Sequence, residues 1–298
     1  MKIIKYSQSY NRPISLALGF FDSLHVGHQA LIDKAKREDL ELAVFTFGQN
    51  LYAGISTPQP LVLTFEERLE RLERRGVEVV VEATPSEEFL STKPIDFLNV
   101  LTNTLNICHI TVGTDYTYGA GGLGDVETLS AFCESRDIPL TIVDLMNIGE
   151  HKIGTRYIRS ALIRGDVEEA NTMLGYRYYL SGEVVSGDMV GRTLGYPTAN
   201  IKVNDDKVIL GLGVYATFVE VDGVQYKGMT AISNRPTFLS QKVTIETYIL
   251  DFQQDLYGKT ITLTFVKKIR DNYKFSSTND LVDRLREDER IVRELNYD

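Results

Sequence analysis

Hydrophobic positions in the first half of the chain form short apolar runs that polar or amphipathic segments separate. Each run has the length and composition of a buried strand, and the runs lie at residues 14–21, 40–47, 77–81, 107–113 and 140–145. Helices are expected in three of the intervals, at 26–36, 64–76 and 125–133. Strands that alternate with helices predict βαβ units, and therefore an α/β domain with a parallel, doubly wound sheet.

The ends of these helices carry capping residues. Thr64 and Glu67 have the spacing of a capping box, and Gly76 follows the last helical position. Asp125 stands where the third helix would begin and can accept a hydrogen bond from its first turn. The capping residues therefore support the boundaries that the apolar pattern predicts.

The pattern changes after two short helices, which are expected at 156–164 and 166–174. From there, short strands follow one another, at residues 180–185, 214–221, 224–232, 243–250 and 260–266. Asp222 and Gly223 lie between two of these strands and predict a tight hairpin turn. Consecutive short strands predict a mainly β domain built as an antiparallel barrel, and an amphipathic helix at 279–295 follows it. We therefore expect two domains, 1–178 and 179–298.

Composition and charge narrow the class of protein. The 298 residues suffice for two domains, each with its own core. The formal net charge of −9 argues against a broad nucleic-acid interface. No apolar run approaches the roughly 18 residues that span a bilayer, and the first residues lack the apolar core of a signal peptide. With only Cys108 and Cys133 present, and no disulfide framework, we expect a cytoplasmic protein without nucleic-acid or membrane partners.

The segment 191–200 reads Gly-Arg-Thr-Leu-Gly-Tyr-Pro-Thr-Ala-Asn and carries the strongest chemical signal. Gly191 and Gly195 allow backbone amides to approach a phosphate closely, and Pro197 presets a bend. The Thr198 hydroxyl and the Asn200 amide are oxygen ligands that suit Mg²⁺ bound together with phosphates. The alternative is an ordinary surface turn. It is less favoured because a second phosphate-type motif lies upstream.

That second motif, Asp-Ser-Leu-His-Val-Gly-His at 22–28, lies between the first long strand and the first helix. His25 and His28 are three residues apart and share one face of the helix start, and Gly27 removes a side chain between them. The free amides of a helix N-terminus and two imidazoles can stabilise the charge that develops on phosphate oxygens in nucleotidyl transfer. A metal-binding histidine pair and two surface histidines are the alternatives. His109 and His151 are not in a ligand pattern, so nothing indicates zinc.

Over nearly its whole length the chain resembles the bacterial bifunctional riboflavin kinase/FMN adenylyltransferase family, often called FAD synthetase. The resemblance implies a Rossmann-like nucleotidyltransferase domain with a parallel sheet, followed by a riboflavin-kinase-type antiparallel barrel with a terminal helix. It is carried by blocks at 19–28, 112–119, 124–125, 158–159, 165–166, 192–200, 234–238, 246, 250–252, 255–258, 270–271 and 274–275. The blocks of the second half are the more specific.

The resemblance implies two reactions and their residues. Riboflavin and ATP give FMN and ADP, and FMN and ATP give FAD and pyrophosphate, with Mg²⁺ accompanying the ATP. Glu246 would be the base for the ribityl 5′-hydroxyl, although its place in a strand would otherwise indicate a solvated side chain. The other implied catalytic residues are His25, His28 and Arg159; the phosphate-binding residues are Gly27, Thr155, Gly191, Gly195, Thr198 and Asn200, of which Thr198 and Asn200 also bind the metal.

Flavin contacts are expected from Asp115, Arg270 and Phe275. For Phe275 a packing role, and for Arg270 a surface charge, are equally compatible with the sequence. No Walker A or protein-kinase signature is present, which excludes those kinase folds.

The chain departs from the family pattern at three places in its first half. Ser23 replaces a glycine, Gly-Gln-Asn-Leu at 48–51 replaces Asp-Pro-His-Pro, and Gly-Thr-Arg at 154–156 replaces Ser-Ser-Thr. Each lost hydrogen bond to a charged group would cost about 1.5–3 kcal/mol. Two further hypotheses therefore accompany the bifunctional enzyme. One is a riboflavin kinase with a weak or inactive first domain, and the least favoured is a flavin- or nucleotide-binding regulator without turnover.

Overall fold

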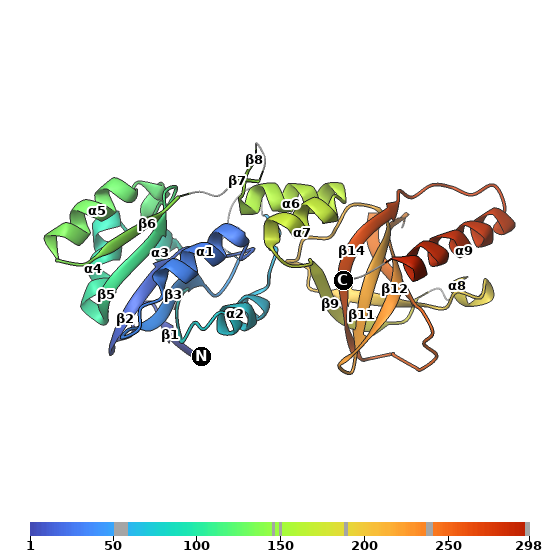
Figure 1. The fold of residues 1–298 in the computed structure, drawn as a ribbon, viewed down its shortest axis with the longest axis horizontal. Coiled ribbons are helices and arrows are strands. Elements are labelled where there is room, and N and C mark those ends of the chain that lie inside the picture. Colours follow the sequence, from blue (N-terminus) through green and yellow to red (C-terminus); the bar gives the residue numbers. More distant parts are fainter. Residues whose placement is uncertain (51–58, 145–146, 149–150, 188–189, 237–240, 296–298) are drawn as a thin grey trace. The chain divides into compact units, whose positions relative to one another are not determined.

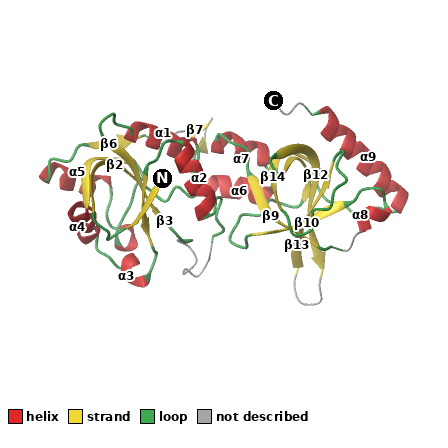
Figure 2. Ribbon diagram, turned by 90° about the horizontal axis from the view of Figure 1, so that it is seen from below, coloured by secondary structure: helices red, strands yellow, loops and turns green. Residues whose placement is uncertain are grey.

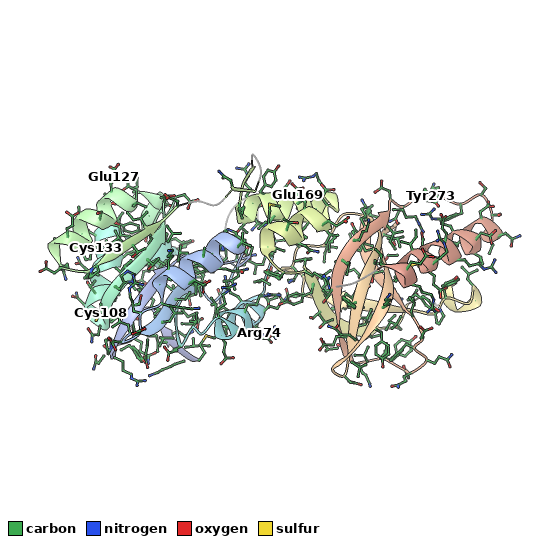
Figure 3. All side chains as sticks on the ribbon, viewed as in Figure 1. Arg74, Cys108, Glu127, Cys133, Glu169 and Tyr273 are labelled. Carbon is green, nitrogen blue, oxygen red and sulfur yellow. The ribbon has the colours of Figure 1, made fainter. Side chains whose placement is uncertain are left out.

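A computed structural model describes residues 1–50, 59–144, 147–148, 151–187, 190–236 and 241–295 (Figure 1). The chain divides into two compact units, Met1–Thr155 and Arg156–Asp298. In the described part of the chain, no helix is both long enough and apolar enough to cross a membrane. Cys108 and Cys133, labelled in Figure 3, both lie in the first unit and are free thiols.

The first unit contains a six-stranded sheet in the order β1-β4-β3-β2-β5-β6, and every strand pair in it is parallel. This confirms the predicted α/β domain, and it adds the edge strand β1. The strands are β1 (Lys2–Lys5), β2 (Tyr10–Leu18), β3 (Glu41–Phe47), β4 (Val79–Ala83), β5 (Leu105–Gly113) and β6 (Leu140–Val143). The chain runs from β2 outwards through β3 and β4, and then returns to β5 on the other side of β2. The strand order therefore reverses next to β2, where open α/β sheets bind ligands.

Helices connect the strands, and α1 packs on β2, β5 and β6. The predicted capping box at the start of α2 is confirmed, because Thr64 accepts a hydrogen bond from the Glu67 amide and Glu67 accepts one from the Thr64 amide. The helices are α1 (Val26–Ala35), α2 (Phe65–Arg74), α3 (Glu87–Leu90), α4 (Pro94–Thr104), the 3₁₀ turn η1 (Ala120–Gly122) and α5 (Val126–Ser135). The short strands β7 (Asn147–Ile148) and β8 (His151–Lys152) form a separate hairpin.

The second unit contains a closed β-barrel (Figure 2). Its strands follow the order β10-β13-β12-β11-β14-β9, and every neighbouring pair is antiparallel. The predicted barrel with a terminal helix is thereby confirmed. Its elements are α6 (Thr155–Arg164), α7 (Val167–Leu174), β9 (Tyr179–Val185), α8 (Val190–Thr193), β10 (Thr198–Val203), β11 (Gly213–Val221), β12 (Val224–Pro236), β13 (Gln241–Ile249), β14 (Thr260–Arg270) and α9 (Thr278–Glu294). The helices α6 and α7 are grouped with the barrel, and the functional boundary near residue 178 stays a prediction.

Contacts inside the barrel show which side chains of β13, the strand that carries Glu246, point inwards. Three fully buried threonine hydroxyls form a chain across neighbouring strands: Thr217 and Thr230 lie 2.9 Å apart, and Thr230 donates to Thr247 at 2.9 Å. Because side chains alternate along a strand, Thr247 inside the barrel directs Glu246 to the outer face.

Candidate active sites

The loop between β2 and α1 places two histidines at the helix start. His25 is the N-cap of α1, and its Nδ1 accepts a hydrogen bond from the backbone N–H of His28 at 3.1 Å. The two imidazoles stack with 3.7 Å between ring centroids. Phe21 and Leu24 adopt positive φ angles of 56° and 42°, which cost energy in residues with side chains. The strained conformation of this loop places the two imidazoles side by side at the helix start.

Both histidines are neutral at neutral pH. Burial lowers the pKa of His25 to about 4, and burial together with the charges of His25 and Arg68 holds the pKa of His28 well below its usual range. Because Nδ1 of His25 is an acceptor, its proton resides on Nε2, which is then a donor. Nδ1 of His28 is buried and has no hydrogen-bond partner among the described residues. Such an unsatisfied atom points to a missing partner, which a bound ligand could supply.

A cleft of about 510 Å³ opens beside this loop, at the carboxyl ends of β2, β3 and β5. His28 and Asp115, which the sequence predicted for phosphate and flavin binding, line the same cleft. Much of the remaining wall is aromatic and comes from Phe20, Phe21, Phe45, Phe47, Phe89, Phe97, Tyr116 and Tyr118. Aromatic faces suit the stacking of a planar ring system. A binding role for these aromatic residues was not predicted from the sequence, although several of them cluster at the ends of predicted strands.

Gly27 and Thr155 lie close to the same loop. A Cβ added to Gly27 would come within 3.1 Å of the His25 ring, so glycine leaves room for the N-cap imidazole. The hydroxyls of Ser23 and Thr155 are hydrogen-bonded at 2.8 Å. Ser23, which replaces a glycine of the family pattern, therefore contacts the predicted phosphate-binding residue Thr155. Arg159 is buried in α6, in the second unit.

In the block at 48–51, which departs from the family pattern, a neighbouring side chain lies close to the Gly48 backbone. A Cβ on Gly48 would come within 2.1 Å of a Glu82 carboxylate oxygen, so this side chain occupies the space. Asn50 donates from its amide to the Gln59 carbonyl at 3.1 Å. Leu51 lies outside the described residues, as do residues 237 and 238 of the barrel blocks.

The second site forms where β10 and β13 pair. Asn200 lies directly opposite Glu246 in the antiparallel register. The Thr198 hydroxyl donates to a Glu246 carboxylate oxygen at 3.2 Å. Three predicted site residues from segments far apart in the sequence therefore meet on two strands. All three side chains are half-buried, so they remain reachable from solvent.

The loop before β10 contains glycines whose backbone lies close to this site. A Cβ on Gly187 would lie 2.2 Å from the Asn200 amide nitrogen, and one on Gly191 would lie 2.2 Å from the Tyr196 carbonyl oxygen. Gly195 has a φ of +82°, which favours glycine. The Gly191 carbonyl accepts hydrogen bonds from the amides of Leu194 and Tyr196, at 3.1 and 2.8 Å. The glycines therefore allow a tight loop to lie against the Thr198–Asn200 segment.

The oxygen set at this site fits a hard cation. A hydroxyl, an amide oxygen and a carboxylate lie together at Thr198, Asn200 and Glu246, which are ligands that Mg²⁺ accepts when phosphates and water complete its shell. Across the residues whose placement is described, no group of three or more His, Cys, Asp or Glu side chains could hold a metal ion.

Arg270 and Phe275 contact each other at the end of β14. The Arg270 guanidinium lies over the rings of Tyr273 and Phe275, with 5.0 and 5.7 Å to the centroids. Its Nε donates to the fully buried Asp288 of α9 at 2.8 Å. With 11% of its side chain exposed, Arg270 is an anchored cation rather than a surface charge.

We expect the stability of the protein to fall between pH 7 and pH 4. Histidines in an unfolded chain take up protons near pH 6.5, whereas the folded protein holds the pKa of both His25 and His109 at about 4. The unfolded state therefore binds more protons over this range. Each such histidine adds up to about 1.4 kcal/mol per pH unit to the decrease in the free energy of unfolding. Urea unfolding at several pH values measures this slope. His25→Gln should make it shallower, and an unchanged slope would contradict the assignment.

Comparisons with known proteins agree across both units. A sequence model of a family described as FAD synthetase matches residues 7–157, and one described as riboflavin kinase matches residues 174–296. A relative from Listeria monocytogenes, described as bifunctional riboflavin kinase/FMN adenylyltransferase, is 36% identical over 93% of this chain and 91% of its own. A relative of the same description from Escherichia coli K12 is 32% identical over 99% of this chain and 97% of its own.

A solved structure with the same fold covers both units. It is described as a macrolide-efflux protein from Streptococcus pneumoniae, is 32% identical to this chain and superposes with a TM-score of 0.91. The match covers 99% of this chain and all of the other. The order of the two units is therefore shared with a protein of known structure.

Proposed function

The chain belongs to the family of bifunctional riboflavin kinase/FMN adenylyltransferases, and we propose that each of its two reactions uses one of the two sites described above. The enzyme phosphorylates riboflavin with ATP to give FMN, and it adenylylates FMN with ATP to give FAD. The matches to both family models also favour this reading over a kinase with an inactive first domain. The observation that carries the residue assignment is the contact between Thr198 and Glu246.

The barrel site would form FMN. Glu246 accepts the proton of the ribityl 5′-hydroxyl as that oxygen attacks the γ-phosphorus of ATP, the bond from this phosphorus to the bridging oxygen of the β-phosphate breaks, and ADP leaves. The Thr198 hydroxyl holds the carboxylate in place. The loop with Gly191 and Gly195 covers the phosphates. Thr198 and Asn200 would hold Mg²⁺, which would neutralise charge on the phosphates. Arg270 and Phe275 border the flavin.

The cleft of the first unit would form FAD. A phosphate oxygen of FMN attacks the α-phosphorus of ATP, the bond to the β-phosphate oxygen breaks, and pyrophosphate leaves. His25 donates from Nε2 to phosphate oxygens, and the amides at the start of α1 add to this stabilisation. Binding of a phosphate group beside His28 would raise the low pKa of this imidazole, because a neighbouring anion favours its charged, donating form. The aromatic wall holds the planar rings, and Asp115 contacts the flavin.

Thr155 and Arg159 would stabilise the departing pyrophosphate. The proposed adenylyltransferase domain, 1–178, includes both residues, whereas the first compact unit ends at Thr155. We also assign the protein to the cytoplasm, with riboflavin, FMN and ATP as its partners. The free cysteines support the cytoplasmic location.

We expect chelation of divalent cations with EDTA to stop both reactions and added Mg²⁺ to restore them. Asn200→Ala should raise the Mg²⁺ concentration that half-saturates FMN formation about tenfold or more, because an oxygen ligand is lost. The same variant should leave the Mg²⁺ requirement of FAD formation from FMN unchanged, which makes this second reaction an internal control. Equal Mg²⁺ titrations of FMN formation in the wild type and in Asn200→Ala would refute the metal assignment.

A further inference from the structure

Arg68 in α2 is fully buried, with no exposed surface. Its guanidinium donates to two backbone carbonyls: Nη1 to Phe20 at 2.9 Å and Nη2 to Phe47 at 2.7 Å. Nε has no hydrogen-bond partner among the described residues. The guanidinium also lies over the rings of Phe20 and Phe65, at 5.0 and 5.5 Å from the centroids. None of the sequence blocks that carry the family resemblance contains this residue.

The two carbonyls belong to neighbouring strand ends on the wall of the cleft. Phe20 follows β2 and Phe47 ends β3, and both line the cleft. Thr46 donates to the same Phe20 carbonyl at 2.6 Å. Arg68 does not line the cleft itself. It therefore holds the loop that leads to His25 and His28 against the end of the adjacent strand.

The charge of Arg68 is retained at a high desolvation cost. Burial lowers its pKa to about 10, with the negative charge of Asp22 opposing the shift, so the guanidinium stays protonated at neutral pH. Its hydrogen bonds go to backbone carbonyls, and the charges of Asp22 and Glu66 offset only part of the cost of its burial. A neutral side chain would avoid that cost. A fixed charge in a poorly screened interior acts on groups several ångströms away, and the pKa of His28 is lowered partly by this charge.

We propose that Arg68 is a positioning residue of the adenylyl-transfer site, which braces the loop before α1 and gives the cleft a fixed positive potential for the phosphates of ATP and for pyrophosphate. This inference rests on the proposed adenylyltransferase function. The charge attracts a ligand in proportion to the ligand's own charge. A brace without an electrostatic role would affect charged and neutral ligands alike.

The test compares charged and neutral inhibitors of FAD formation from FMN. Arg68→Met should raise the inhibition constant of pyrophosphate at least tenfold and that of adenosine less than twofold. Arg68→Lys keeps the charge and should restore pyrophosphate inhibition to within about threefold of the wild type. Arg74→Met is the matched control on the same helix, because 75% of that side chain is exposed (Figure 3), and it should change neither constant.

FMN formation from riboflavin in the barrel reports whether each variant is folded. If Arg68→Met loses that activity or its cooperative unfolding, Arg68→Gln replaces it, since its amide can still donate to one carbonyl. Equal changes for pyrophosphate and adenosine, or none for either, would overturn the inference and leave the proposed function intact. A wild-type protein that forms no FAD would overturn the proposed function and the inference with it.

Discussion

Replacing Glu246 by glutamine is expected to lower the rate of FMN formation by about a thousandfold or more. Glutamine keeps the size of the side chain and can accept a hydrogen bond from Thr198, as the carboxylate does at 3.2 Å. It cannot take the proton of the attacking hydroxyl. General base catalysis contributes about 10²–10⁴-fold, and the loss of negative charge beside the metal ligands removes further stabilisation.

The measurement is the steady-state rate of FMN formation from riboflavin, ATP and Mg²⁺. FAD formation from added FMN should continue at the wild-type rate, because the cleft of the first unit does not contain Glu246. Glu220→Gln, on an exposed position of β11, is the matched control and should leave both rates unchanged. Wild-type turnover of Glu246→Gln would refute the assignment of the base.

Replacing His28 by alanine is expected to lower the rate of FAD formation about a thousandfold and to spare FMN formation. His28 lines the cleft, stacks on His25 and presents a buried nitrogen without a partner among the described residues. A lost donor to developing phosphate charge costs about 10²–10³ in rate. The lost stacking partner also frees the His25 ring, so the effect should reach the upper end of that range.

Rates of FAD formation from FMN and of FMN formation from riboflavin are measured on the same preparation. Lys34→Ala, exposed on α1, is the control and should behave as the wild type in both assays. A parallel fall of both rates in His28→Ala would contradict two independent sites. Wild-type FAD formation in this variant would remove His28 from the catalytic residues.

The strongly patterned elements could be predicted from the sequence. The runs that became β2 and β3 are apolar on both faces, as central parallel strands require, and the Asp222–Gly223 turn joins β11 to β12 as expected. The missed elements carry weaker signals. The strand β1 has four residues, three of them exposed, and α4 begins at Pro94 without a side-chain cap. The strand β10 was not predicted, because its first residues belong to a glycine-rich motif that indicates a loop.

The site could be predicted where short motifs carry its chemistry. His25 and His28 stand three residues apart at a helix start, and the glycines around Thr198 indicate a phosphate loop. The aromatic wall and Arg68 could not be found in this way. Their partners come from separate strand ends and from α2, and only the fold brings them together. An arginine in an amphipathic helix is normally read as a surface residue, and nothing in the local pattern shows that Arg68 is buried.

The most direct test of a bifunctional enzyme is a chromatographic flavin assay on the purified wild-type protein with ATP and Mg²⁺. One reaction starts from riboflavin and a parallel one starts from FMN. We expect FMN and then FAD in the first reaction, and FAD in the second. FMN from riboflavin together with no FAD from FMN would contradict the account, because the first unit would then lack adenylyltransferase activity despite its intact histidine pair and cleft.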